Sequence, residues 1–457
     1  MADQGRAAFT QSQLNAKQIG DLSDSTQKTF KKVLNKNPIK RQIPISNPSG
    51  WTWDAHPLKN KIFFNTENYE FTTTLDLSDY ENVATGQTYY VRKEGSDTND
   101  GLTWETAFKT VWKAIQMTDR KRIYVGAGIY NRNEGLQGVG ITKPVEIIGI
   151  GDVRFGQYDN LTWTLSSGQT KTYETTRTNV NRIFDSKTVD TNGDYLELNK
   201  KASIAEVEAN PNSWYTDGTK VYVHTATDVK PDATIFVYMN ITGFAATNTT
   251  CYLENIQFEG GSWAVKMNSD VLGVPAKLYA KNITAKYAGA GNGYEILGSD
   301  TVFVNCIAAK NLDDGFNYHS SSVGNICRAI EIGCIGRDNG QSSDTDNGST
   351  MHDGGKIIRI NGEYMRNKGP NVADVTVGTE TWNMDCVAYD STSANSQKTD
   401  FQASDPAGGA VKAWYENCRN TNSKSLYSLG IMDANSTVKL RGCNLPLSIG
   451  SGVRNSY

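Results

Sequence analysis

A short phrase of alternating polar and apolar residues returns eight times between residues 253 and 444. Each copy contains an Asn, Asp or Gly that we take as its anchor, and in most copies an apolar residue or a Cys follows the anchor. The intervals between anchors run from 23 to 32 residues, and a period of this size is typical of stacked repeat units. The anchors are Asn255, Asn282, Asn305, Gly333, Asn361, Asp385, Asn417 and Gly442.

These phrases are predicted to be strands rather than helices. They alternate with a period of two, contain β-branched residues or Cys, and are bounded by Gly, Asn, Asp or Ser. A helical repeat would need long stretches with apolar spacings of three and four residues, and none is visible. Because one turn of a parallel β-helix takes ~20 to 30 residues, each period is predicted to form one coil, with the anchor at a bend and the next residue facing inward. The predicted fold is all-β: a right-handed parallel β-helix with a short α-helical N-terminal segment and a β-rich insertion.

The first 36 residues carry the pattern that predicts a helix. Their apolar residues recur at roughly helical spacing, and Asn37-Pro38 ends the pattern. We interpret this segment as a docking or self-association element, with a frayed tail as the alternative. The apolar positions are Phe9, Leu14, Ile19, Leu22, Phe30, Val33 and Leu34.

Four regions follow from these patterns. Residues 1–88 are predicted to be a helical and irregular adaptor, with a strand at 69–77. Residues 89–150 hold a strand, a polar turn and a short amphipathic helix starting near Thr103, which together cap the first coils. Residues 151–240 interrupt the rhythm as a β-rich insertion with a hairpin around Asp217-Gly218, and residues 241–457 form the main solenoid. The aromatic residues of the insertion either pack together or stack on sugars; they are Trp163, Tyr173, Trp214 and Tyr215.

Composition and charge narrow the classes of partner. The net charge of −3 gives no electrostatic reason to expect nucleic acid, and no apolar run approaches the ~20 residues that span a bilayer. The first residues lack the basic and apolar segments of a signal peptide. Five of the seven Cys lie at or beside an anchor, so we expect reduced, buried thiols and neither a metal site nor a cofactor. These five are Cys306, Cys334, Cys386, Cys418 and Cys443.

The densest polar cluster lies between the second and sixth anchors. Segments beginning at Gly291, Gly315, Gly348 and Gly369 align on that glycine, and strand alternation predicts that their outward residues share one surface. Neighbouring coils stand ~4.8 Å apart, so these side chains would form one patch. The predicted outward residues are Glu295, His319 and His352, with Asn317, Thr350 and Asn371 beside them and Asp313, Asp314, Asp353 and Asp374 at the strand ends.

Such a patch suits the cleavage of a polysaccharide. Hydrolysis needs a carboxylic acid and a second carboxylate, whereas a lyase uses a base and a cation that neutralises a uronate. We assign Asp314 and Asp353 as acid/base candidates and His319 and His352 as proton carriers or sugar ligands. Strand capping by Asp, Asn and His is the structural alternative. Glu295 and Asp374 are supporting carboxylates, and the substrate-binding candidates are Asn317, Asn371, Lys356, Arg359 and Asp313.

Three stretches near the start of the coils resemble a known family. Residues 89–115, followed by Arg122-Ile123-Tyr124-Val125-Gly126 and Lys143-Pro144-Val145-Glu146-Ile147, are similar to the N-terminal cap and first coils of the pectin-lyase-like superfamily. The resemblance covers about residues 88–444. It implies the right-handed parallel β-helix and leaves the reaction open, because this scaffold carries lyases, hydrolases, epimerases and binders.

A second resemblance is to β-helical tail proteins of phages and prophages. It is carried by residues 311–319, 352–362 and 369–375. The resemblance implies a homotrimeric tailspike or receptor-binding protein, assembled in the host cytoplasm, docked on tail or baseplate proteins by its N-terminal segment, and acting on a bacterial surface polysaccharide. The stretch after residue 444 is short, whereas many tailspikes have a large C-terminal domain. Two alternatives are a non-enzymatic receptor-binding or structural tail protein and a free bacterial pectinase-like enzyme, which the missing signal peptide disfavours.

Overall fold

The computed structural model describes residues 42–341, 343–393, 398–421, 423–446 and 448–456. The chain divides into two compact units, Met1–Leu75 and Asp76–Tyr457. The helix predicted for the first 36 residues lies outside the described residues. In the first unit, β1 (Gln42–Pro44), β2 (Ile62–Asn65) and β3 (Glu70–Thr73) form an antiparallel sheet. The strand predicted at 69–77 therefore exists, but it ends at Thr73.

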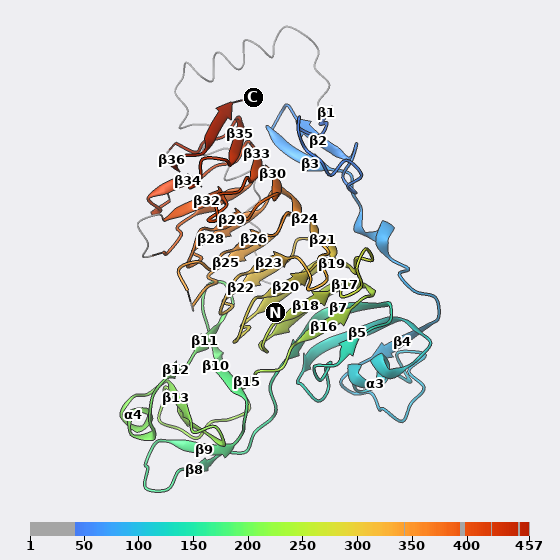
Figure 1. Ribbon diagram of the computed structural model, residues 1–457. Helices are drawn as coiled ribbons and strands as arrows, with labels where there is room; N and C mark the ends of the chain where they lie inside the picture. The colour runs from blue at the N-terminus through green and yellow to red at the C-terminus, as the bar shows by residue number, and fades with distance from the viewer. Residues whose placement is uncertain (1–41, 342, 394–397, 422, 447, 457) are drawn as a thin grey trace. The chain divides into compact units, whose positions relative to one another are not determined.

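The second unit is built on two long sheets whose strands pair in parallel throughout (Figure 1). From residue 244 onward the chain alternates between them, so each period adds one strand to the first sheet and one or two to the second. The ten-stranded sheet contains β6 (Gly140–Ile141), β16 (Phe244–Thr247), β18 (Val265–Asn268), β20 (Tyr294–Leu297), β23 (Phe316–His319), β26 (Ser349–Met351), β29 (Val372–Val375), β32 (Thr399–Ser404), β34 (Tyr427–Ile431) and β36 (Ser448–Gly450).

The sixteen-stranded sheet starts as long strands and then divides into two branches after β19. The long strands are β4 (Gln87–Val91), β5 (Arg120–Tyr130), β7 (Val145–Gly156), β17 (Thr250–Glu259) and β19 (Lys277–Lys286). One branch is β21 (Asp300–Val304), β24 (Arg328–Ile332), β27 (Lys356–Ile360), β30 (Glu380–Met384), β33 (Lys412–Glu416), β35 (Thr437–Arg441) and β37 (Val453–Ser456); the other is β22 (Ile307–Ala309), β25 (Ile335–Arg337), β28 (Glu363–Met365) and β31 (Val387–Tyr389).

The eight anchors lie at the bend between these two branches, or at the equivalent bend within the long strands. All eight have φ between 52° and 64°, the left-handed region in which Asn, Asp and Gly are tolerated best. The residue after the anchor faces inward at most copies: Ile283, Cys306 and Cys334 are fully buried. The predicted bend and the predicted side-by-side pairing of successive phrases are therefore confirmed.

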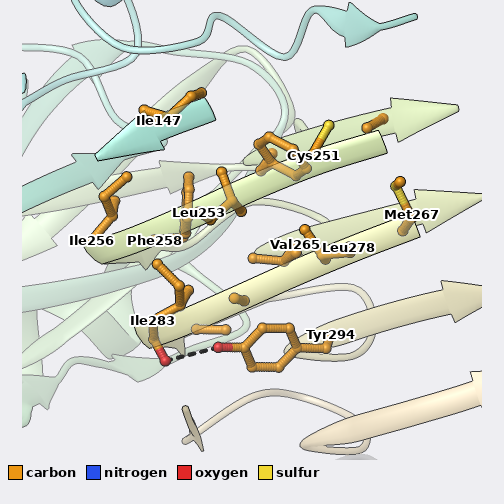
Figure 2. Packing of buried hydrophobic residues seen from close by; sticks show 14 of the residues in the cluster. Ile147, Cys251, Leu253, Ile256, Phe258, Val265, Met267, Leu278, Ile283 and Tyr294 are labelled. Carbon is orange, nitrogen blue, oxygen red and sulfur yellow. Dashed lines mark hydrogen bonds between the residues drawn. The ribbon is translucent and has the colours of Figure 1, made fainter. Parts of the chain in front are cut away.

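The core lies between the two sheets and is made of inward residues from successive coils. Figure 2 shows Leu253 and Leu278 of the sixteen-stranded sheet lying near Val265 and Met267 of the ten-stranded one. The hydroxyl of Tyr294 donates to the carbonyl of Ile283 at 2.8 Å, so its polar end is satisfied inside the core. Full burial of such side chains stabilises by about 1.5–3 kcal/mol each, and this stacking is what holds the coils together.

Six of the seven Cys are buried, and all seven are free thiols. Cys443 is half-buried. Inside the core the thiols donate to backbone carbonyls, as Cys306 does to Ala280 at 3.5 Å. They therefore act as small hydrophobic residues with a satisfied S–H group, as the sequence predicted.

A short helix packs near the start of the second unit, but it begins later than predicted. Helix α3 (Val111–Gln116) is capped by Thr110, whose hydroxyl accepts from the backbone N–H of Lys113. Thr103, the predicted start, instead forms a turn in which its hydroxyl accepts from the N–H of Thr106. A 3-10 turn, η1 (Leu77–Tyr80), precedes the first long strand and stacks Tyr80 on Tyr279 with ring centroids 4.5 Å apart. Among the described residues, no helix is long and apolar enough to cross a membrane.

The insertion leaves the stacked parallel strands after Gly156, where β7 ends, rather than at residue 151. The predicted hairpin is present: β13 (Ser213–Thr216) pairs antiparallel with β14 (Lys220–His224). Trp163 and Trp214 are 2 % exposed in its core, so both pack within the insertion. The remaining elements are β8 (Thr164–Leu165), β9 (Tyr173–Thr176), β10 (Val180–Val189), β11 (Tyr195–Glu197), β12 (Asn199–Lys200), α4 (Ile204–Ala209) and β15 (Ile235–Met239).

A buried carboxylate ties the insertion to the solenoid. Asp194 is fully buried and forms ion pairs with Lys286 at 2.6 Å and Arg337 at 2.5 Å, with Lys310 at 4.0 Å. These three cations come from the ends of β19, β22 and β25 or the residue after, that is, from three successive coils. The neighbouring cations outweigh the burial that opposes them and hold the pKa of Asp194 below its usual range.

Candidate active site on the ten-stranded sheet

The parallel register fixes which outward side chains are neighbours. Glu295 on β20 is level with Asn317 on β23 and Thr350 on β26, whereas His319 is level with Leu297. The sequence alignment placed Glu295 beside His319, which is wrong by two residues because Gly293, rather than Gly291, lies opposite Gly315. Side chains alternate with a period of two, so this shift leaves Glu295 on the same outward face.

His319 and Asp353 form a hydrogen-bonded pair at the end of this face. Nδ1 of His319 lies 3.1 Å from Oδ2 of Asp353, and the two side chains are 37 % and 34 % exposed. Ser320 donates to the same carboxylate oxygen from its backbone N–H at 3.0 Å and its hydroxyl at 3.1 Å. Burial raises the pKa of Asp353, but these bonds outweigh it and hold the pKa below its usual range. An ionised Asp353 fixes Nδ1 as the protonated nitrogen and leaves Nε2 for a substrate.

His352 lies flat against the ring of His319. The ring centroids are 3.9 Å apart and the planes differ by 16°. Burial, and next the positive charge that His319 can carry, lower the pKa of His352 to about 3. His352 is therefore neutral near pH 7 and supports the neighbouring ring, which does not fit its predicted role as a proton carrier.

Asp314 is buried at the other end of β23. Its carboxylate accepts from Nδ2 of Asn317 at 2.8 Å and from the backbone N–H and side-chain amide of Asn347. Burial raises the pKa of Asp314 well above its usual range, and the nearby carboxylates of Asp346 and Asp313 add to the effect. Asp313 is half-buried, so it lies at the rim of this cluster.

Three predicted site residues, Asp374, Arg359 and Asn371, are fully buried. Asp374 lies level with Met351 on the inward side of β29 and is fully buried, as is Arg359. The two form a bidentate pair with both distances 2.9 Å, and Arg359 also donates to Ser349, Thr381 and Asn383. The predictions of Asp374 as a supporting carboxylate and of Arg359 as a substrate-binding residue are wrong, because each satisfies the charge of the other inside the core.

Asn371 is likewise internal. It is fully buried and belongs to a chain of side-chain amides in which each Nδ2 donates to the Oδ1 of the next at 2.9 Å. This ladder satisfies the backbone of successive turns, so Asn371 is not a substrate ligand. Its members are Asn311, Asn339, Asn367 and Asn371.

The remaining candidate, Lys356, belongs to the sixteen-stranded sheet. Its ammonium donates to the carbonyl of Gly378 at 3.0 Å and lies 3.4 Å from Glu380. Burial lowers the pKa of Lys356. The structure therefore gathers Glu295, His319 and Asp353 around one outward face and leaves Lys356 in its own ion pair. Asn317 and Thr350, predicted beside them, are buried, and Asn317 donates to Asp314 in place of a substrate.

Several contacts of the site were not predicted. Asn292 and Asn347 occupy the same place as Asp314, each directly before a glycine at the start of a strand. The backbone N–H of Asp314 donates to Asn292, whose amide in turn donates to Glu295. The repeated Asn-Gly, Asp-Gly, Asn-Gly pattern on three coils was the signal available in the sequence. For Ser320 no comparable signal exists. Over the described part of the chain, no group of three or more His, Cys, Asp or Glu is placed to hold a metal ion.

Known proteins similar to this chain are found among solved structures. No protein-family model matches the chain, and no curated protein sequence does either. A glycoside hydrolase of known structure is 11 % identical with a TM-score of 0.48, over 81 % of this chain and 96 % of that one. Pectate lyase Pel9A is 12 % identical with a TM-score of 0.40, over 81 % and 80 %. The protein ORF18 of Geobacillus virus E2 is 11 % identical with a TM-score of 0.28, over 94 % and 73 %.

The similar solved structures thus include polysaccharide-degrading hydrolases and lyases. Their sequence identities to this chain are low and their TM-scores lie below 0.5. The chemistry of this chain therefore has to be argued from its own side chains, of which the paired His319 and Asp353 on an outward sheet face are the most informative.

Proposed function

We propose that the chain is a right-handed parallel β-helix that binds and hydrolyses a bacterial surface polysaccharide, as a phage tailspike-like protein. The reacting groups lie on the outward face of β20, β23 and β26. The observation that carries the proposal is the 3.1 Å contact between His319 and Asp353, which uses Nδ1 of a partly exposed imidazole and leaves Nε2 without a hydrogen-bond partner among the described residues.

In this proposal His319 is the general base. Asp353 orients the ring, stabilises the imidazolium that forms, and is itself held by Ser320. His352 limits rotation of the ring by stacking on it. Nε2 of His319 then accepts a proton from a water molecule as that water attacks the anomeric carbon.

Glu295 is the partner acid. It is half-buried on the same face, one coil earlier and two residues back from His319. Sheet spacing places the two Cα atoms about 8 Å apart, so both side chains can approach one glycosidic bond from the same face. The glycosidic C–O bond breaks as Glu295 gives its proton to the leaving oxygen, and a later exchange with water returns both groups to their starting forms.

Asp314 is better placed as a positioning residue than as the acid. It lies five residues from His319 along β23, roughly 16 Å at strand spacing, which is too far for both to act on one bond. Its backbone N–H holds Asn292, and Asn292 holds Glu295. Asp314 therefore acts indirectly, through Asn292, on Glu295, which carries the proton.

Elimination is the less favoured reaction. A lyase needs a cation beside the base to neutralise the uronate carboxyl group. The two cations predicted to bind substrate are committed elsewhere: Arg359 to Asp374 in the core and Lys356 to Glu380. A third cation of this face, Lys266, is level with Glu295 and one coil farther from His319, so it does not lie beside the base. Hydrolysis by Glu295 and His319 requires no such cation.

The test is to incubate purified protein with a panel of capsular, O-antigen and wall polysaccharides and to follow new reducing ends and unsaturated products separately. We expect reducing ends without unsaturation, and loss of product in Glu295→Gln and His319→Ala. Lys277→Gln, an exposed change on the sixteen-stranded sheet, is the control. Unsaturated product would show a lyase. Binding without any product would favour the non-enzymatic receptor-binding protein.

The virion assignment also belongs to this proposal. The apolar residues of the first 36 positions have the spacing of a docking helix, and we propose that this segment attaches a homotrimer to tail or baseplate proteins. Light scattering on the full chain and on a chain lacking residues 1–36 tests the stoichiometry. A monomeric full chain would overturn the trimer and leave the cleavage site untouched.

A further inference from the structure

A tryptophan and a lysine form a pair on the same outward face, one coil before Glu295. The ammonium of Lys266 lies 3.9 Å from the ring centroid of Trp263, and both side chains are half-buried. Lys266 is level with Glu295 in the parallel register. The pair therefore sits beside the proposed proton donor, on the side away from His319.

Both polar groups of this pair lack a protein acceptor. Within the described ranges, the ammonium of Lys266 has no carboxylate within 4.0 Å and no hydrogen bond, and the indole N–H of Trp263 donates to no protein atom. Glu295, the nearest carboxylate by register, is instead bonded by the amide of Asn292. The charged ammonium and the neutral indole N–H are thus two neighbouring donors without a partner in the described part of the chain.

The backbone around the pair is shaped to hold the indole in place. An added Cβ at Gly291 would lie 2.4 Å from Nε1 and 2.8 Å from Cδ1 of Trp263, so the ring covers that glycine. The carbonyl of Trp263 accepts from the N–H of Gly243 at 2.9 Å. The aromatic face in turn restricts Lys266, because an ammonium is attracted to the face of an indole ring.

We propose that Trp263 and Lys266 form a subsite for an anionic sugar, one whose carboxylate or phosphate accepts from both donors. This inference rests on the proposed cleavage site, whose substrate it narrows to an acidic glycan. A glycan that follows the stack meets a new strand every ~4.8 Å, so the acidic unit lies next to the bond that Glu295 protonates. A charge-assisted hydrogen bond from Lys266 then selects this unit over a neutral one.

Fluorine NMR of the full chain labelled with 5-fluorotryptophan tests the subsite without any assay of activity. The chain has nine Trp, and Trp263→Phe identifies the line of Trp263. Glucuronate, glucose 6-phosphate and glucose are the probes. We expect the Trp263 line to shift with one or both anions and not with glucose, and we expect Lys266→Gln to weaken that binding about tenfold while Lys277→Gln does not.

Gly291→Ala provides a second variant. Gly291 does not have a left-handed φ, so alanine is tolerated by the backbone but displaces the indole, and the shift with anions should be lost. Equal shifts with glucose, no shift with either anion, or unchanged affinity in Lys266→Gln would overturn the subsite. The Trp263 line could shift as expected while Glu295→Gln and His319→Ala keep full cleavage activity. That result would overturn the proposed cleavage site and support the anion subsite.

Discussion

Two aspartates that pair with basic side chains lie on opposite sides of the same sheet. Asp353 meets His319 outside, where both are about one-third exposed, and Asp374 meets Arg359 inside, where both are fully buried. The inner pair is bidentate and surrounded by further acceptors, whereas the outer pair leaves one nitrogen of the ring free for a substrate. Similar residue types thus serve stability in one place and chemistry in the other, and exposure decides which.

Replacing His319 is the change that best distinguishes the role of the outer pair from that of the inner pair. His319→Ala should lower the rate of polysaccharide cleavage by about 10²–10⁴-fold, the usual contribution of general-base catalysis. Because the ring is partly exposed, the free energy of unfolding should change by less than about 1 kcal/mol. The two readouts are product formation and urea unfolding. A large loss of stability with little loss of rate would place His319 among the structural residues.

Breaking the inner pair should have the opposite effect. Arg359→Met leaves Asp374 charged and without its partner in the core, and such changes cost about 3–5 kcal/mol. The check is the urea midpoint. Asp374→Leu combined with Arg359→Met should be less harmful than Arg359→Met alone, because no charge is then left unpaired. Equal stability of the single variant and the wild type would mean that water reaches this pair.

Acid should weaken the outer region through His352. Its pKa in the folded protein, about 3, lies below the ordinary value of 6.5, so its contribution to stability is complete above pH 6.5 and is lost as the pH falls toward 3. The wild type should lose up to about 1.4 kcal/mol per pH unit in this range relative to His352→Phe. Unfolding by urea at pH 7, 5.5 and 4 measures the difference. Parallel curves for the two proteins would show that His352 titrates normally.

The smallest effect on stability is expected at Asn305, which lies at one of the bends in the sixteen-stranded sheet. Asn305 has a φ of 53°, and Asn305→Ala should cost about 1 kcal/mol because alanine tolerates this region poorly. Asn305→Gly should cost less, since glycine adopts the same φ without strain. Thermal unfolding distinguishes the two. An alanine variant as stable as the glycine variant would show that the bend does not restrict its residue.

The sequence predicted the repeat well because its signal is local. Each anchor is a polar residue or glycine that tolerates left-handed φ, and in most copies an apolar residue or a Cys follows it. Seven short intervals sufficed to place eight bends. The outward face carrying His319 followed from simple alternation along β23.

The register and the interior charges could not be obtained in the same way. Two glycines near residue 292 offer equally good alignments, and backbone hydrogen bonds of the folded sheet, such as that from the N–H of Tyr294 to the carbonyl of Gly315, select one. Arg359 lies between Ile358 and Ile360, which are buried as well, so alternation would place the arginine outside. Its inward orientation depends on Asp374, Thr381 and Asn383, partners that lie on other coils.

The buried carboxylate of Asp194 has a mechanical consequence. A simple stack of repeats can open at one end and come apart a rung at a time. Here the carboxylate of Asp194, which the insertion supplies, pairs with cations from three consecutive coils. These three coils must therefore separate together. Mechanical unfolding, or the local opening that precedes proteolysis, then has one high free-energy barrier there instead of three low ones.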